Sequence, residues 1–226
     1  MLLALDTAQA GCSVSLWDGA TQCASHFEAL RRGHAEILFD RIGTCLAAAS
    51  ASYDDVTSIL VTTGPGTFTG QRVGLAAARG LGLATKAPVI GITTFEAVAA
   101  GLIHAGHAPD LCHIIFDARR DEVYHQGFDL SGPLPVALTE GAVMSIDAAK
   151  ALVTTGTMAG TGALLMANAL PVFDGFETPD ATRFGWLGQH VTPGPDRLAR
   201  PVYLRAPDAK PPSNPPAPRA ATPTHS

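Results

Sequence analysis

The sequence predicts an α/β protein built from two lobes. Short apolar runs of strand length alternate with longer runs that repeat at helical spacing, and this pattern begins again after Pro109. The chain of 226 residues is also long enough for two lobes of about 100 residues each. We therefore expect an amino-terminal lobe over residues 1–108 and a smaller second lobe over residues 109–206.

The composition narrows the class of protein. Hydrophobic residues make up 46% of the chain and charged residues 15%, which is typical of a folded domain. Residues 207–226 are rich in proline and poor in apolar side chains, so we predict a disordered tail there. The 15 Lys and Arg against 20 Asp and Glu give a net charge of −5, which argues against a domain that binds nucleic acid without a partner protein.

The cysteines and the amino terminus favour a cytoplasmic protein. The four cysteines form no C-x-x-C pair, and free thiols in a reducing compartment explain them best. The first residues carry no basic flank and reach Asp6 too early for a signal peptide, and no uncharged run is long enough to span a membrane. We expect a cytoplasmic location and no membrane partner.

The first lobe begins with strands. Residues 2–6 form a buried-strand pattern, and two alternating runs follow on either side of a turn at Asp18 and Gly19, which predicts a hairpin. We expect Ser13 and Ser15, at alternate positions of the first run, to face solvent. Apolar residues at helical spacing then predict a helix over residues 34–50.

The rest of this lobe alternates strands with helices. Residues 58–63 and 88–93 are short apolar runs, and each precedes a helical segment, over 69–85 and 95–106. Thr93 and Glu96 have the spacing of a capping box at the start of the second helix. The result is the alternating pattern of an α/β lobe.

The second lobe repeats the opening of the first. Residues 112–117 form an apolar strand that ends in Asp117, as residues 2–6 end in Asp6, and an alternating strand follows each of them. Beyond it we expect a strand at 151–156, a glycine turn and short helix at 160–170, a helix at 179–191 and an extended segment at 200–206.

Two features of the chain suit nucleotide chemistry. Asp6 and Thr7 at a strand end are able to position a metal-bound phosphate or a water molecule, and Asp117 holds the matching place in the second lobe. A plain turn explains the Asp-Thr pair equally well. Gly64 and Gly66 lie in a turn from a strand into a helix, where free amides bind anions, although the spacing fits neither a Walker loop nor G-x-G-x-x-G.

A packing role for this loop ranks first and a phosphate cradle second. Small residues recur at every fourth position of the following helix, and glycine inside a helix costs about 1 kcal/mol against alanine, so close contact with another backbone must compensate. The strip consists of Gly70, Gly74, Ala78 and Gly82. The backbone that this strip contacts belongs either to the same lobe or to a partner protein.

Metal and nucleophile chemistry have little support in the sequence. His34 has Leu38 four residues on, where a metal-binding helix would carry a second histidine, and His104 and His107 have no third ligand in view. Surface histidines explain these residues better. Neither a G-x-S-x-G elbow nor a cysteine in the setting of a known nucleophile is present.

The motifs together resemble one family. "LALDTA", "CSVSLW", "GPGTFTGQR", "FDARRDEVY" and "RPVYLRA" occur in the order and spacing of the TsaB (YeaZ) family of tRNA threonylcarbamoyladenosine biosynthesis, over residues 1–206. The resemblance implies a two-lobed fold of the actin, sugar-kinase and heat-shock-protein class (ASKHA, ribonuclease H-like) with a reduced second lobe. It also implies a non-catalytic scaffold that pairs with a TsaD-like catalytic subunit and lets a TsaE-like ATPase dock. The complex installs threonylcarbamoyl on adenosine 37 of tRNAs that read codons beginning with adenosine.

The resemblance assigns roles to the residues singled out above. We expect no catalytic or metal-binding residue in this chain and no intrinsic cofactor, with ATP or ADP at the complex interface left open, and contact with tRNA only through the complex. Without its partner the chain would form a homodimer. The expected interface residues are Leu38, Ile42, Cys45, Gly70, Gly74, Ala78 and Gly82. The expected remnant of a nucleotide or phosphate site is Asp6, Thr7, Gly64, Gly66 and Asp117.

Two other functions remain open. An ASKHA-type ATPase or small-molecule phosphotransferase would use Asp6, Thr7 and Asp117. A peptidase, suggested by the older description of the wider superfamily as glycoproteases, has the least support.

Overall fold

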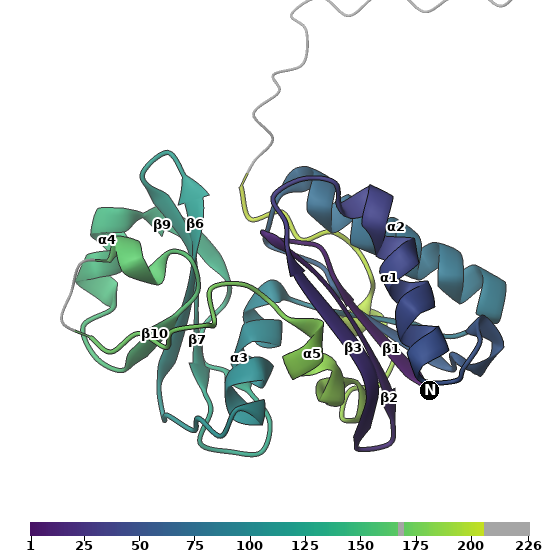
Figure 1. Cartoon of the computed structure of the whole chain (residues 1–226). Helices are drawn as coiled ribbons and strands as arrows, with labels where there is room; N and C mark the ends of the chain where they lie inside the picture. Colours follow the sequence, from purple (N-terminus) through teal and green to yellow (C-terminus); the bar gives the residue numbers. More distant parts are fainter. Residues whose placement is uncertain (167–169, 206–226) are drawn as a thin grey trace, which may run out of the picture.

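The computed structural model describes residues 1–166 and 170–205 and shows two five-stranded sheets (Figure 1). The first sheet has the strand order β3-β2-β1-β4-β5, with β1 antiparallel to β2 and parallel to β4. Its strands are β1 (Leu2–Asp6), β2 (Gly11–Asp18), β3 (Thr21–Ala29), β4 (Ser58–Thr62) and β5 (Val89–Ile92). The predicted strands and the hairpin at Asp18 and Gly19 are therefore confirmed.

Three helices of the first lobe also follow the prediction. They are α1 (His34–Ala48), α2 (Phe68–Thr85) and α3 (Thr94–His104), and a short helix η1 (Tyr53–Asp55) precedes β4. The hydroxyl oxygen of Thr67 accepts a hydrogen bond from the Gly70 amide at the start of α2, and that of Thr93 accepts one from the Glu96 amide at the start of α3. Glu96 then directs its carboxylate to Arg197, in an ion pair of 2.5 Å.

The second sheet repeats the pairing pattern of three strands of the first sheet. Strand β6 is antiparallel to β7 and parallel to β10, as β1 is to β2 and β4. The elements are β6 (Cys112–Arg119), β7 (Glu122–Asp129), β8 (Val136–Ala137), β9 (Ala142–Ser145), α4 (Ile146–Leu152), β10 (Thr157–Ala159) and η2 (Ala163–Leu165). The predicted strand at 151–156 is wrong, because α4 extends through Leu152 and the strand starts only at Thr157.

The C-terminal helices lie on the first sheet, not in the second lobe where the prediction put them. They are α5 (Ala181–Phe184), η3 (Gly185–Gln189) and η4 (Pro195–Arg197). Phe184 and Leu187 pack with Leu2 and Trp17, and the first sheet thus carries α1 and α2 on one face and α5 with η3 on the other. The expected tail at 207–226 lies outside the described residues.

The prediction that Ser13 and Ser15 face solvent is wrong for the same reason. Both side chains are fully buried, because α5 covers the face of β2 on which they lie. Ser13 Oγ accepts a hydrogen bond from the Ala181 amide at 2.8 Å, and Ser15 Oγ donates one to the Ala181 carbonyl at 2.6 Å. The two buried serines of β2 therefore fix α5 against the first sheet.

Helix α3 lies between the two sheets and belongs to both cores. Ala97 and Ala100 pack in the core of the first sheet, whereas Val98 and Leu102 pack with Phe116 and other apolar side chains of the second. Because its apolar residues cover more than one face, α3 connects the lobes by packing as well as by sequence. Over the described residues, no helix combines the length and apolar character needed to cross a membrane.

Candidate functional site

The carboxylate of Asp6 is completely buried at the end of β1. Its Oδ1 accepts hydrogen bonds from the Thr62 hydroxyl at 2.5 Å and from the Ala8 amide at 3.2 Å. Its Oδ2 has no hydrogen-bond partner among the described residues. Burial raises the pKa of Asp6 from 3.8 to about 7, against the lowering effect of these hydrogen bonds. A carboxyl group without exposed surface does not present itself to a ligand in this conformation.

The glycine loop packs against the turn that follows β1. A Cβ atom at Gly66 would overlap the carbonyl oxygen of Ala8, and one at Gly70 would overlap that of Thr7. The Thr7 hydroxyl donates to the Gly70 carbonyl at 2.7 Å, and the Thr67 amide donates to the Ala8 carbonyl at 2.8 Å. The chain's own backbone thus fills the space beside Gly66 and Gly70 and takes up the Thr67 amide, which favours the packing role of the loop.

Gly64 has a separate reason to be glycine. Its φ of 107° is in the region that side chains rarely adopt. A Cβ atom there would also lie 2.6 Å from the side-chain carbon of Gln71, which is buried beside the loop. The loop is therefore specified by its own packing at each of its glycines.

The Asp117 carboxylate is engaged by a neighbouring residue. It accepts a hydrogen bond from the Arg119 amide at 2.7 Å and forms an ion pair with the Arg119 guanidinium at 3.0 Å. Arg119, Arg120 and Asp121 all have positive φ, between 57° and 63°, in the tight turn from β6 to β7. The Asp-Ala-Arg motif thus closes a strained hairpin, and Arg119 neutralises the carboxylate that we expected to hold a phosphate.

The predicted interface residues lie inside the first lobe. Leu38, Ile42 and Cys45 of α1 are buried in the core beneath the helix. On α2, a Cβ atom at Gly74 would lie 2.6 Å from Thr7 Oγ1, and Ala78 is fully buried. A Cβ atom at Gly82 would lie 2.5 Å from the side chain of Val89. The small strip allows α2 to approach its own sheet, so packing within the lobe accounts for these residues, and their assignment to a partner interface stays an untested prediction.

A second set of small and apolar residues covers the outer faces of the same helices. Phe39 is 50% exposed and Leu83 is 85% exposed, and a Cβ atom at Gly43 or Gly80 would meet nothing within 4 Å. We call this surface the two-helix face: Phe39, Gly43 and Ala47 on α1 with Gly80, Leu83 and Ala84 on α2. Helices with small residues at an exposed surface allow close approach of another helix.

The sequence also contains a signal for the two-helix face. Gly43 and Ala47 are four residues apart, as are Gly80 and Ala84, which is the same spacing as in the buried strip. Periodicity alone places both strips on helix faces, and only the structure shows which of the two faces inward.

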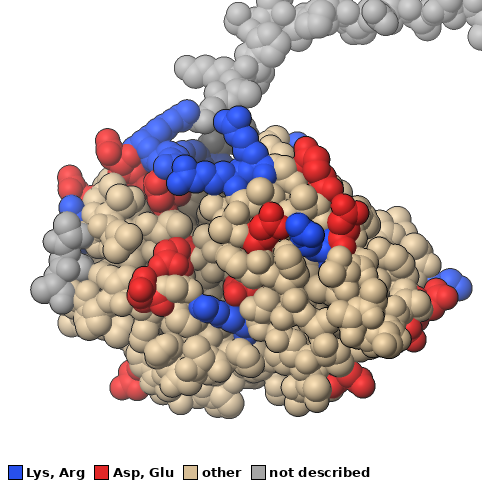
Figure 2. All heavy atoms as spheres, viewed as in Figure 1, with Lys and Arg blue, Asp and Glu red and all other residues tan. Residues whose placement is uncertain are grey.

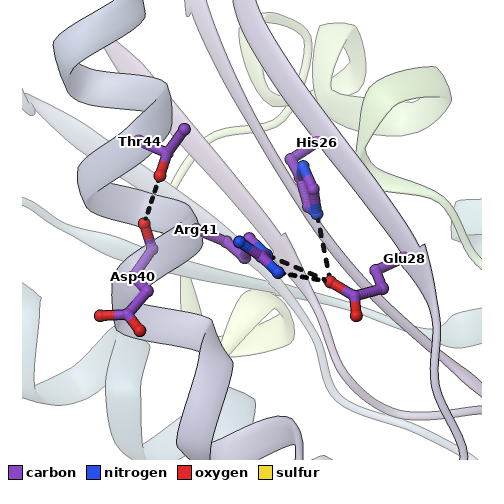
Figure 3. A network of polar contacts seen from close by, with 5 residues as sticks. All are labelled: His26, Glu28, Asp40, Arg41 and Thr44. Carbon is purple, nitrogen blue, oxygen red and sulfur yellow. Dashed lines mark hydrogen bonds and ion pairs between the residues drawn. The ribbon is translucent and has the colours of Figure 1, made fainter.

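Polar contacts fix α1 to the edge of the first sheet (Figure 3). The Nε and Nη2 atoms of Arg41 donate to one carboxylate oxygen of Glu28 on β3, at 3.1 and 2.8 Å, and His26 lies 3.5 Å from the same oxygen. The hydrogen bond from Arg41 lowers the pKa of Glu28. The Asp40 carboxylate points away from Arg41 in this view. The helix is thus held on its β3 side and leaves an acidic residue on its exposed surface.

The histidines form no metal centre in the described part of the chain, where no group of three or more His, Cys, Asp or Glu is placed to hold a metal ion. His34 is buried, contrary to the expectation of a surface residue, and its Nε2 lies 3.2 Å from the Gln9 carbonyl oxygen. His104 stacks with Trp186, and His107 packs against Phe173. Packing within the fold explains these three residues.

Comparisons with known proteins agree with the sequence motifs. A family model described as "TsaD: tRNA N6-adenosine threonylcarbamoyltransferase" matches residues 27–160. The tRNA threonylcarbamoyladenosine biosynthesis protein TsaB of Escherichia coli is 37% identical over 123 residues, which are 54% of this chain and 52% of that protein. The alignment therefore spans about half the length of this relative. An uncharacterized protein of Mycobacterium tuberculosis is 33% identical over 180 residues, covering 80% of this chain and 79% of the relative.

Solved structures extend the likeness over nearly the whole fold. YeaZ from Pseudomonas aeruginosa is 26% identical, with a TM-score of 0.73 over 89% of this chain and 99% of that one. A second structure, of an uncharacterized protein from the same organism with similarity to peptidase YeaZ, is 26% identical, with a TM-score of 0.75 over 90% of this chain and 99% of that one. Together with the paired sheets, these likenesses confirm the predicted two-lobed ASKHA-type fold.

Proposed function

Because the chain belongs to the TsaB (YeaZ) family, we propose that it is a non-catalytic scaffold subunit in the biosynthesis of threonylcarbamoyladenosine in tRNA. In this role it pairs with a TsaD-like catalytic subunit, and a TsaE-like ATPase docks on the pair. The modified position would be adenosine 37 of tRNAs that read codons beginning with adenosine. The relatives' names support the pathway, and the two-helix face supports the scaffold role.

The two-helix face is the observation that carries this proposal. It exposes two large apolar side chains, Phe39 and Leu83, beside glycines at which the surface is open. Helices from a partner are able to pack closely there and to cover the exposed parts of both apolar side chains. The same face supports a homodimer of the isolated chain, as expected from the sequence.

Size exclusion with light scattering tests the pairing. The full chain is measured alone and mixed with the TsaD-like protein of its own organism, as wild type, Gly43→Arg and Gly80→Arg. Gly194→Arg is the matched control, because a Cβ atom at Gly194 also meets nothing within 4 Å and its φ of −173° is ordinary extended backbone. Gly74→Arg is unsuitable, since the new side chain would enter the core beside Thr7.

The proposal predicts that wild type and Gly194→Arg form the heterodimer, whereas Gly43→Arg and Gly80→Arg remain folded and do not. A mixture in which wild type stays separate, or in which all variants pair equally, contradicts it. A monomeric wild type at micromolar concentration contradicts the homodimer.

The alternative of an ATPase or phosphotransferase has weaker support. Asp6 is buried, and Asp117 is paired with Arg119. ATP turnover by the isolated chain that Asp6→Ala abolishes would favour this alternative. Cleavage of casein with added metal would favour a peptidase. A nucleotide at the subunit boundary remains a prediction for the complex.

A further inference from the structure

A groove with a volume of about 320 Å³ lies between α2 and the C-terminal segment 199–203. Arg79 Nη2 donates to the Ala199 carbonyl and Arg72 Nε donates to the Tyr203 hydroxyl at 3.1 Å, so two hydrogen bonds hold the segment against the helix. The residues that line the groove are Arg72, Leu75, Ala76, Arg79, Pro201 and Tyr203.

The two arginines of this groove carry charge that no carboxylate neutralises within residues 1–166 and 170–205. Arg72 bonds to a neutral hydroxyl and Arg79 to a neutral carbonyl, and neither is among the ion pairs of the described residues. Other arginines are different: Arg119 pairs with Asp117, and Arg205 pairs with Glu122. The groove is therefore a place where an acidic protein of net charge −5 keeps local positive charge available for an anion.

The spacing of the arginines favours an anion with more than one charge. Arg72 and Arg79 are seven residues apart on one helix, which places them two turns apart on the same side, about 10 Å along the axis. Each guanidinium would thus contact a separate anionic group. Their anchoring hydrogen bonds reduce the side-chain freedom that binding would otherwise remove.

Two exposed aromatic rings adjoin the arginines. Phe68 is 59% exposed and Tyr203 is 46% exposed, and their ring centroids are 5.9 Å apart in a stacked arrangement. The guanidinium carbon of Arg72 lies 3.6 Å from the centroid of the Phe68 ring. An acidic peptide would satisfy the arginines alone, whereas RNA offers phosphates to the arginines and bases to the rings.

Basic side chains also gather along the upper edge of the molecule in Figure 2, near the boundary between the lobes, while most of the face in view has few charges of either sign. The Arg205 side chain donates to the Arg119 carbonyl at 3.3 Å, which places the C-terminal segment against the β6–β7 turn. The segment that forms the groove therefore continues to the second lobe, where Arg205 contacts the β6–β7 turn.

We propose that this groove binds a single-stranded segment of RNA, with Arg72 and Arg79 on two phosphates and the rings of Phe68 and Tyr203 against a base. The choice of RNA rests on the proposed function, in which the RNA is a tRNA. Direct contact at this groove differs from the expectation that the chain meets tRNA only through the complex, because the net charge of the whole chain does not show that positive charge is concentrated locally. The groove lies on the side of α2 that contacts the C-terminal segment, and none of its lining residues belongs to the two-helix face, although Leu83 follows Arg79 by one helical turn on the same side of α2.

Fluorescence anisotropy with a labelled single-stranded oligouridine and the full chain tests this site. Two phosphate contacts predict a slope of about −1.4 for log affinity against log salt, which is about a sevenfold loss between 50 and 200 mM salt. The double variant R72A/R79A should lose this salt-dependent binding. The matched control R31A/R32A removes the same charge from exposed positions between β3 and α1, and it should bind as wild type does.

The aromatic part of the site has its own pair of variants. Tyr203→Ala should lower RNA affinity about tenfold, because it removes the ring on which a base stacks. Tyr203→Phe keeps the ring and loses the hydrogen bond to Arg72, so its affinity should stay within about twofold of wild type. Thermal unfolding of each variant establishes that it is folded before its affinity is compared.

Three outcomes would overturn the inference: absence of RNA binding by wild type, equal loss in R72A/R79A and R31A/R32A, or displacement of the RNA by polyglutamate at equal charge concentration. The last would assign the groove to an acidic protein segment. Pairing with the TsaD-like protein is measured on the same variants. If pairing persists in wild type while RNA binding is absent, only this inference fails; if RNA binding persists while pairing is absent, only the scaffold proposal fails.

Discussion

Replacing Asp6 by asparagine should make the protein more stable at neutral and alkaline pH. The Asp6 carboxyl is fully buried, and Oδ2 has no hydrogen-bond partner among the described residues. Asparagine has nearly the same shape and keeps an acceptor for the Thr62 hydroxyl and the Ala8 amide. Because it cannot ionise, the variant isolates the energetic effect of the carboxylate charge.

The size of this stability gain follows from the difference between the pKa of Asp6 in the unfolded chain and its pKa in the fold. The pKa of Asp6 is 3.8 in an unperturbed chain and about 7 in the fold, so between these values the unfolded chain has lost a proton that the folded chain keeps. The folded state therefore loses stability as the pH rises from 3.8 to 7, by about 1.4 kcal/mol per unit and about 4 kcal/mol in total. Between pH 5 and pH 8, the asparagine variant should gain about 3 kcal/mol on wild type.

Urea unfolding at several pH values between 5 and 8 measures this gain. The free energies of unfolding of wild type and Asp6→Asn are subtracted at each pH, so that effects of all other titrating groups cancel. Asp40→Asn, at an exposed position of α1, is the control and should show no such trend. A difference between wild type and Asp6→Asn that stays constant across this range would refute the reasoning, because it would mean that Asp6 ionises in the fold as it does in water.

Three further predictions concern the packing described above. Gly80→Ala should stabilise the protein by about 1 kcal/mol, because its Cβ atom meets open space on a helix. Gly70→Ala should destabilise the protein by about 2 kcal/mol or more, because its Cβ atom would overlap a carbonyl oxygen. Urea unfolding at pH 7 measures both changes, and equal effects would contradict the inward orientation of the strip. Ser15→Ala removes two buried hydrogen bonds and should cost about 1–3 kcal/mol in the same assay, where a neutral result would show that water replaces them. Burial lowers the pKa of His125 from 6.5 to about 4, so the free energy of unfolding of wild type should fall by about 3 kcal/mol as the pH falls through this interval. His125→Gln should remove most of that loss. Acid unfolding that is the same for wild type and for the variant would contradict this prediction.

The sequence predicts the local elements of the first lobe well, because each has its own signal. Strands β1, β4 and β5 are short apolar runs, and α2 and α3 begin at threonines that cap them. The second lobe is harder to predict, since several of its elements have only two to seven residues. At that length neither alternation nor helical periodicity is distinctive, which is why a helix end at Leu152 was predicted as a strand.

Long-range packing could not be predicted from these patterns. Alternation on β2 correctly places Ser13 and Ser15 on one face, but nothing local shows that a helix more than 160 residues later covers this face. The buried and exposed strips of α2 share one periodicity, so the choice of Gly74 over Gly80 as an interface residue had no local basis. The candidate residues Asp6 and Thr7 were found from a motif, and their burial depends on a loop from another part of the chain.

The return of the C-terminal helices to the first sheet has a consequence for synthesis on the ribosome. All five strands of that sheet have emerged once β5 is made, yet Leu2, Trp17 and the buried serines of β2 stay uncovered until Ala181–Phe184 follows. The nascent chain therefore exposes an apolar sheet face while the whole second lobe is being translated. Completion of the amino-terminal lobe therefore waits until the second lobe and α5 have been made, although the five strands of its sheet are available much earlier.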